Sequence, residues 1–231
     1  MNTLENWKSV CETVSNESLA DKVCNLLESS ILNMELKPGT VLSEDEIAAT
    51  LNVSRSPVRE ALLRLEHIGL VDKERKSRVV SSITEEKIIN NYHIWAMVES
   101  YTAGLACLNA TAQEMSAMRE AIKEMEQSKD GGDIMNYHDL NYQFHEMLVA
   151  PCPYKRLIEQ HKNALSHIRW GYNYTLMWLE DIGYSNSQHS DILNAYSERD
   201  RESVERAVRE HTGNASSRLQ SLYIKKNLNK I

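Results

Sequence analysis

Apolar residues recur at helical spacing in the first third of the chain. Their period predicts one helix over 18–34 and two shorter helices over 44–51 and 54–67. Ser43 and Ser54 precede the two shorter helices and are suited to cap them. Turn-forming residues separate and end the helices, namely Pro38-Gly39, Asn52-Val53 and Gly69. The pattern therefore predicts three helices, with a tight turn between the second and the third.

The hydrophobic period changes after residue 69. The β-prone pairs Leu70-Val71 and Val79-Val80 flank a charged tip, which predicts a two-stranded hairpin. From Thr84 onward the pattern is helical again, with its clearest break at residues 129–132, and we expect about six helices between 84 and 224.

These elements predict a mainly α protein with two domains. A small domain of three helices and a β-hairpin covers residues 19–82, and an all-α bundle covers 83–224. Residues 1–18 are predicted to be a polar arm and 225–231 a polar tail.

Composition supports helices and restricts the class of protein. The 231 residues are 42% hydrophobic but include only 8 glycines and 4 prolines, fewer than a turn-rich fold normally uses. We find no signal-peptide pattern and no apolar stretch of transmembrane length. The four cysteines have no CxxC spacing and are expected to be reduced. These features predict a soluble, cytoplasmic protein without a membrane partner.

Charge is distributed unevenly along the chain. The formal net charge is −7, yet residues 50–80 hold 7 basic and 4 acidic residues, a local net of +3. A basic segment in an acidic protein is typical of a contact with a polyanion.

Two short helices followed by a basic hairpin form the winged helix-turn-helix arrangement. The helix after Ser54 would place Arg55, Ser56 and Arg59 at its N-terminal turn, where an arginine can bind guanine O6 and N7 or a phosphate. The hairpin tip up to Arg78 would contact the neighbouring groove or the backbone. A solvated, charged helix face explains the same spacing, so the spacing alone leaves both interpretations open.

The segment LKPGTVLSEDEIAATLNVSRSPVREALLRLEHIGLV resembles the DNA-binding domain of the GntR family of bacterial transcription regulators. The resemblance covers residues 19–80 and implies DNA contacts by Arg55, Ser56 and Arg59. Two residues depart from the family pattern. Asp45 stands where many relatives have a basic residue, and Ser77 stands where relatives usually have a glycine near the DNA backbone. The predicted DNA-binding residues are Ser54, Arg55, Ser56, Arg59, Ser77 and Arg78.

The helical domain contains a set of residues suited to a metal. Asn141 and His145 are four residues apart and share a helix face, and His189 and His211 follow in other helical segments. Such residues can converge inside a helical bundle and bind a transition metal. Scattered histidines are also common on surfaces and in cores, so this signal alone is weak.

Residues 84–224 resemble the FCD ligand-binding domain of the FadR subfamily, on Glu99, NYQFHEML, QHSDILNAY and VREH. In that domain an Asp-x-x-x-His pair and two later histidines often bind a divalent metal. The resemblance implies that His145, His189 and His211 are ligands, with Asn141 in place of the aspartate. We expect zinc or nickel, held more weakly than in relatives because the anionic ligand is missing. His138 lies on the same helix face and could assist, although a solvated histidine is the simpler interpretation.

Relatives often bind an effector carboxylate with an arginine four residues before the Glu99 position, where this chain has Trp95. Arg169 is the alternative candidate for that role, and a plain salt bridge is its simpler interpretation. The resemblance implies a homodimeric regulator that binds a palindromic, double-stranded operator and responds to a small carboxylate effector. The competing hypotheses are a metal-free, anion-sensing regulator and a metal-dependent hydrolase.

Overall fold

The computed structural model describes residues 17–75, 77–175 and 183–228. It divides into two compact units, one ending at Ile83 and the other beginning at Thr84. The predicted arm lies outside the described residues except for its last two positions. The last helix continues to Leu228 and so includes four residues of the predicted tail. Lysine and leucine are good helix formers, which explains this extension.

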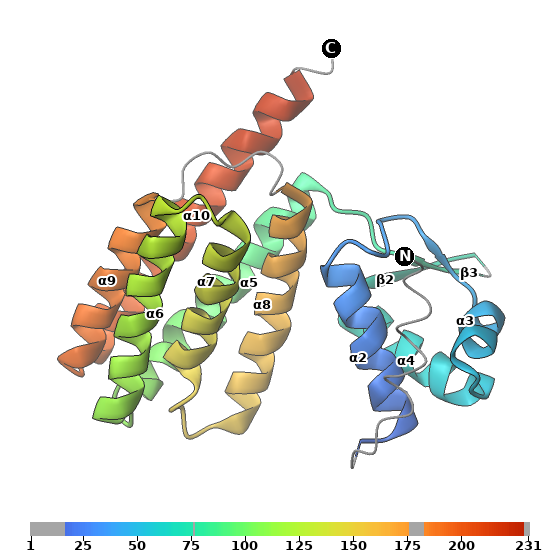
Figure 1. Cartoon of the computed structure of the whole chain (residues 1–231), viewed down its shortest axis with the longest axis horizontal. Helices are drawn as coiled ribbons and strands as arrows, with labels where there is room; N and C mark the ends of the chain where they lie inside the picture. The colour runs from blue at the N-terminus through green and yellow to red at the C-terminus, as the bar shows by residue number, and fades with distance from the viewer. Residues whose placement is uncertain (1–16, 76, 176–182, 229–231) are drawn as a thin grey trace. The chain divides into compact units, whose positions relative to one another are not determined.

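Three helices form most of the first unit, as the hydrophobic period predicts (Figure 1). They are α2 (Leu19–Leu32), α3 (Glu44–Leu51) and α4 (Arg55–His67). Ser18 and Asp21 form a capping box at the start of α2, and Asn52 makes the turn between α3 and α4 in the left-handed conformation with φ 54°. The three helices share one apolar core, which includes Val23, Leu27, Ile31, Ile47, Leu51, Val58, Leu62 and Leu65.

The sheet of the first unit has one strand more than the hairpin pattern predicts. The hairpin consists of β2 (Val71–Glu74) and β3 (Ser77–Val80), and β1 (Val41–Leu42) pairs with the other edge of β3. All the pairings are antiparallel, and Val41 lies opposite Val79. A strand of two residues is too short to show an alternating pattern, so the sequence presents it only as part of a turn.

Six helices make up the described part of the second unit, in agreement with the expected number, and they lie side by side as a bundle (Figure 1). They are α5 (Glu85–Ala106), α6 (Ala112–Asp130), α7 (Ile134–Val149), α8 (Lys155–Thr175), α9 (Gly183–Ser197) and α10 (Arg201–Leu228). Thr111 and Glu114 form a capping box at the start of α6. Gly132, with φ 72°, makes the turn after that helix.

Packing in the bundle places α5 between α8 and α10, while α6 contacts both α7 and α9. The shared core contains Met118, Met125, Tyr137, Phe144, Leu148, Ile192, Tyr196, Val204 and Val208. Within the described residues, no helix combines the length and the apolar character that crossing a membrane requires. The fold class predicted from the sequence is confirmed, with a winged helix-turn-helix domain and an all-α bundle.

Candidate functional site

The N-terminal turn of α4 presents the predicted DNA-binding residues to solvent. Ser54, Arg55, Ser56 and Arg59 are all exposed, whereas Val58 on the opposite side of the helix is fully buried. Ser54 is the N-cap residue of α4, as expected from the sequence. Its hydroxyl, however, does not make the expected capping hydrogen bond. The first backbone N–H groups of α4 therefore lack a side-chain cap, which leaves this end of the helix suited to an anion.

The two arginines of this turn differ in their surroundings. Arg55 forms an ion pair with Asp45 of α3, and both side chains are largely exposed. Arg59 makes no ion pair with any described residue. Asp45 is one of the two residues that depart from the family pattern, and its carboxylate directly contacts one of the predicted DNA-binding side chains.

Arg78 does not extend from the wing as a residue that contacts DNA would, which differs from the sequence-based prediction. Its guanidinium donates to Glu44 of α3 at 2.8 Å and to Glu66 of α4 at 2.9 Å, and its side chain is only 15% exposed. In this structure Arg78 joins the sheet to both helices of the helix-turn-helix. Ser77 lies exposed at the start of β3, while Lys76 at the tip lies outside the described residues.

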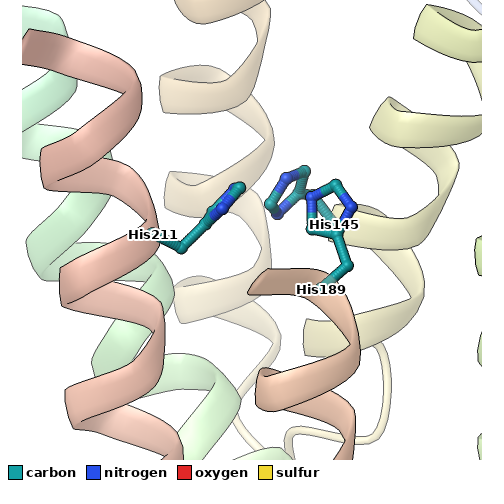
Figure 2. Close-up of side chains that lie close together, drawn as sticks. All are labelled: His145, His189 and His211. Atoms are coloured by element: carbon teal, nitrogen blue, oxygen red, sulfur yellow. The ribbon is translucent and has the colours of Figure 1, made fainter. Parts of the chain in front are cut away.

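Three predicted metal ligands meet inside the bundle. His145 of α7, His189 of α9 and His211 of α10 point toward one another (Figure 2), and each offers a ring nitrogen within 4.8 Å of the others. The ring centroids are 4.7–5.3 Å apart, and at most 3% of each residue is exposed. We call these three residues the His cluster.

A buried carboxylate orients the His cluster from α5. Glu99 is fully buried, and its two oxygens lie 2.8 Å from His145 Nδ1 and 2.7 Å from His161 Nε2. Since a carboxylate accepts, Nδ1 of His145 carries the proton and Nε2 is left to face the cluster. The sequence interpretation did not assign roles to Glu99 or His161. Glu99 is the only charged residue between Ile88 and Gln113, and a lone carboxylate in such a stretch could have indicated a buried role.

The protonation states suit metal binding. Burial lowers the pKa of His189 well below its usual range, and burial together with the nearby His145 lowers the pKa of His211 to about 3. Burial alone would raise the pKa of Glu99, but interaction with His145 and hydrogen bonds from both histidines outweigh it and lower the pKa to about 2. The rings of His189 and His211 are therefore neutral while Glu99 stays ionised.

Several buried polar atoms near this centre lack a partner among the described residues. They are His145 Nε2, both ring nitrogens of His189 and the indole nitrogen of Trp95. The Trp95 ring packs edge-on against His145, with centroids 4.9 Å apart. An unsatisfied buried polar group costs about 1–3 kcal/mol, so a group of them indicates a bound partner.

The remaining candidates lie around the cluster. Asn141 is half-buried on α7, one turn before His145. His138 is buried beside Tyr137. The simpler interpretation, which took it for a solvated histidine, is therefore wrong. Arg169 lies 3.4 Å from Asp139 and stacks on Tyr142 at 5.3 Å from the ring centroid, which corresponds to the salt bridge considered as its simpler interpretation.

Known protein families match both units. The FCD domain matches residues 91–214, more than half of the chain. Bacterial regulatory proteins of the gntR family match residues 19–80. The chain belongs to the GntR family of transcription regulators.

Individual relatives agree with this assignment. The HTH-type transcriptional repressor RspR of Escherichia coli K12 is 26% identical over 208 residues, which cover 87% of this chain and 89% of the repressor. The gluconate operon transcriptional repressor of Bacillus subtilis is 31% identical over 139 residues, covering 59% of this chain and 56% of that protein. The solved structure of E. coli McbR/YncC shares the fold, with a TM-score of 0.75 and 22% identity over 90% of this chain and 99% of that one.

Membership of the GntR family decides between the competing classes of function. The matched proteins are regulators and not enzymes, so the metal-hydrolase hypothesis is set aside. The regulator binds DNA through its winged helix-turn-helix domain, and its second unit is an FCD domain.

Proposed function

We propose that this GntR regulator is a cytoplasmic homodimer that binds a palindromic operator through α4 and senses a carboxylate effector through a metal-containing FCD domain. The observation that carries the sensor half of the proposal is the buried His cluster, whose ring nitrogens lie within 4.8 Å of one another. The operator half rests on the exposed residues at the start of α4.

On the DNA side, Arg59 is the principal candidate for base contact because it is exposed and makes no ion pair with a described residue. Arg55 would contribute once its pair with Asp45 is broken or bridged by DNA. Ser54 and Ser56 would donate hydroxyl hydrogen bonds to phosphate beside the uncapped helix end. Two winged helix-turn-helix domains bound to two half-sites would supply the affinity for DNA that one small domain lacks.

On the sensor side, the donor set fits a divalent transition metal. Neutral imidazoles favour zinc, nickel, copper or iron(II), and three of them with an open position form a familiar site. Glu99 holds His145 in the tautomer that a metal requires. The Asn141 amide oxygen is the candidate for a fourth ligand, from one turn before His145.

The same donor set supports a carboxylate as effector. Three imidazoles and an amide carry no charge, so a bound dication would keep its full positive charge and attract an anionic ligand. The Trp95 indole N–H is unpartnered beside the cluster and could donate to such a ligand, with Arg169 as a second candidate. The relative named for the gluconate operon is consistent with a carboxylate effector.

Coupling requires the effector to bind the DNA-competent and the DNA-incompetent states with different affinities. The alternative is a metal-free regulator in which His145, His189 and His211 donate hydrogen bonds to an anion. The ring nitrogens of His189 have no hydrogen-bond partner in the described part of the chain, and the neutral rings of His189 and His211 each carry one N–H for such a bond. His145 would need a second proton on Nε2, because Nδ1 already donates to Glu99.

The test is fluorescence anisotropy with a labelled duplex from the region upstream of the regulator's own gene, at fixed salt. Chelator-stripped protein is measured alone, with zinc, and with zinc plus gluconate or another carboxylate from a small panel. We expect specific binding by the wild type and a change of at least about fivefold when zinc and the matching carboxylate are both present. His189→Ala should bind DNA but lose this response.

Three outcomes separate the hypotheses. A carboxylate response that is identical in stripped and zinc-loaded protein would favour the metal-free sensor. A response that persists in His189→Ala would remove the His cluster from the sensor. Absence of any preference for the upstream duplex over a scrambled duplex would contradict the operator half of the proposal.

A further inference from the structure

Glu99 joins two histidines in the interior of the bundle. One of its oxygens accepts from His145 Nδ1 at 2.8 Å, and the other accepts from His161 Nε2 at 2.7 Å. The side chains of Glu99 and His161 are 0% exposed and that of His145 is 1% exposed, so both bonds are shielded from bulk water. His145 belongs to the His cluster, whereas His161 of α8 does not. The carboxylate therefore connects the cluster to a histidine outside it.

Packing alone does not explain a histidine at position 161. Ala164, Leu165 and Ile168 follow it at spacings of three, four and seven residues and are all buried, so His161 lies on the apolar stripe of α8. This stripe faces inward where α8 packs against α5. A polar ring on such a stripe is costly to bury unless it forms a hydrogen bond. The bond from Nε2 to Glu99 is the one that His161 makes there.

We propose that His161 is a positioning residue of the metal centre. It binds the second oxygen of Glu99 and so holds the carboxylate in the orientation that leaves His145 Nε2 free for a metal. This inference rests on the metal centre of the proposed function and adds to that centre a residue that is not a ligand. His161 acts through Glu99 and does not itself touch the metal.

Two bonds fix the Glu99 carboxylate where one would not. Each oxygen has one donor, and no other described side chain donates to either of them. Without the His161 N–H, the second oxygen would be buried without a partner, which is unfavourable. The carboxylate would then turn toward another donor or admit water, and its bond to His145 would no longer hold that ring in a single state.

The tautomer of His145 decides whether the cluster can bind a metal. A neutral imidazole offers one lone pair, on the nitrogen that carries no proton. The bond to Glu99 places the proton on Nδ1 and leaves the lone pair on Nε2, which is buried and has no partner among the described residues. With the proton on Nε2 instead, His145 would present an N–H to the metal and the cluster would lose one of its three ligands.

The neutral ligand set makes this orientation more important. The candidate ligands are three imidazoles and the Asn141 amide, so the affinity cannot rely on an anionic ligand. It depends instead on donors that are oriented before the metal binds. Residues that orient a ligand commonly change metal affinity by about tenfold to a hundredfold.

Zinc affinity of the chelator-stripped, full-length protein, measured by competition with a chromogenic chelator, tests the proposal. His161→Leu removes the N–H but keeps most of the bulk, whereas His161→Gln keeps an N–H donor near the position of Nε2. His167→Leu makes the same exchange further along α8 and is the matched control. We expect His161→Leu to lose about tenfold to a hundredfold in zinc affinity, His161→Gln to lose less than about threefold, and the control to match the wild type.

Two further measurements separate positioning from a general contribution to packing. In a Glu99→Gln background, His161→Leu should cause little further loss of zinc affinity, because His161 acts only through the carboxylate. Nitrogen-15 NMR of histidine-labelled, metal-free protein should show the Nδ1–H tautomer of His145 in the wild type and in His161→Gln. His161→Leu should show a mixture of both tautomers. Far-ultraviolet circular dichroism checks that each variant is folded.

The outcomes distinguish this inference from the metal centre on which it rests. Wild-type zinc affinity in folded His161→Leu would overturn the role of His161, and so would losses that simply add in the double variant. A His145 tautomer that stays Nδ1–H in His161→Leu would overturn it as well. A wild type that binds no zinc would overturn the proposed metal centre. The tautomer measurement, which is made without metal, would then decide whether His161 orients His145 through Glu99.

Discussion

Asp45 at the start of α3 forms an ion pair with Nε of Arg55, the first residue of α4. The two residues thus connect the first and second helices of the helix-turn-helix on the side that carries the predicted DNA contacts. A carboxylate at this place partly neutralises Arg55 and would repel the phosphates of a nearby duplex.

We predict that Asp45→Asn increases the affinity for DNA. The change keeps the size of the side chain, frees Arg55 and removes one negative charge from the interface. Affinity for a scrambled duplex should rise roughly threefold to tenfold at low salt, more than affinity for the operator, so the specificity ratio should fall. Anisotropy titrations on both duplexes measure this. An unchanged affinity for scrambled DNA would mean that α3 does not approach the duplex.

Arg59→Ala should weaken operator binding more than Arg55→Ala does. Arg59 makes no ion pair with a described residue and can contact DNA without losing an existing partner, whereas Arg55 must give up Asp45. Each good bidentate base contact contributes about 1–3 kcal/mol. Arg206→Ala, which removes an exposed arginine from α10, is the matched control and should bind normally. Equal operator affinities for all three variants and the wild type would exclude α4 as the recognition helix.

Arg78→Ala should reduce the stability of the winged-helix unit. Its side chain is 15% exposed and binds two carboxylates, so its removal leaves Glu44 and Glu66 without their shared partner. We expect a loss of about 1–3 kcal/mol in the free energy of unfolding of this unit, measured in urea. Arg75→Ala at the exposed tip should change stability little. Normal stability combined with lost DNA affinity would instead support the DNA contact that the sequence predicts for Arg78.

The winged-helix unit shows what can be predicted from local sequence. Pro38-Gly39 forms a turn between α2 and β1, Gly69 follows the end of α4 as expected, and the helical periods locate α2, α3 and α4. The strand β1 was missed because its two residues depend on backbone pairing with β3. The ion pairs of Arg78 were also missed, since they join residues 34 and 12 positions away in sequence. Contacts of that kind depend on tertiary packing and leave no local signal.

For the His cluster, family resemblance identified the three histidines, and the structure brings all three together. Spacing alone could not have done so, because the residues come from three different helices. The Glu99–His161 contact was not predicted for the same reason. It depends on the packing of α5 against α8, which the period of either helix does not specify.

Asn141→Asp should tighten metal binding and weaken the carboxylate effector. A carboxylate gains Coulomb energy with a cation that an amide dipole cannot match, and it cancels one unit of the charge that an anionic effector would meet. We expect at least about a tenfold increase in zinc affinity by competition with a chromogenic chelator, and a smaller thermal shift by gluconate. Asn136→Asp, an amide change two turns from His145 on the same helix, is the control. Equal zinc affinities for wild type and Asn141→Asp would remove residue 141 from the set of ligands.

The most direct test of the account is calorimetric titration of zinc into chelator-stripped protein. The wild type should bind one zinc per chain, and His189→Ala should lose that binding because it removes a buried imidazole from the centre of the cluster. His67→Ala, which removes an exposed histidine from α4, should bind zinc like the wild type. No zinc binding by the wild type, or equal binding by all three proteins, would contradict a metal centre formed by His145, His189 and His211.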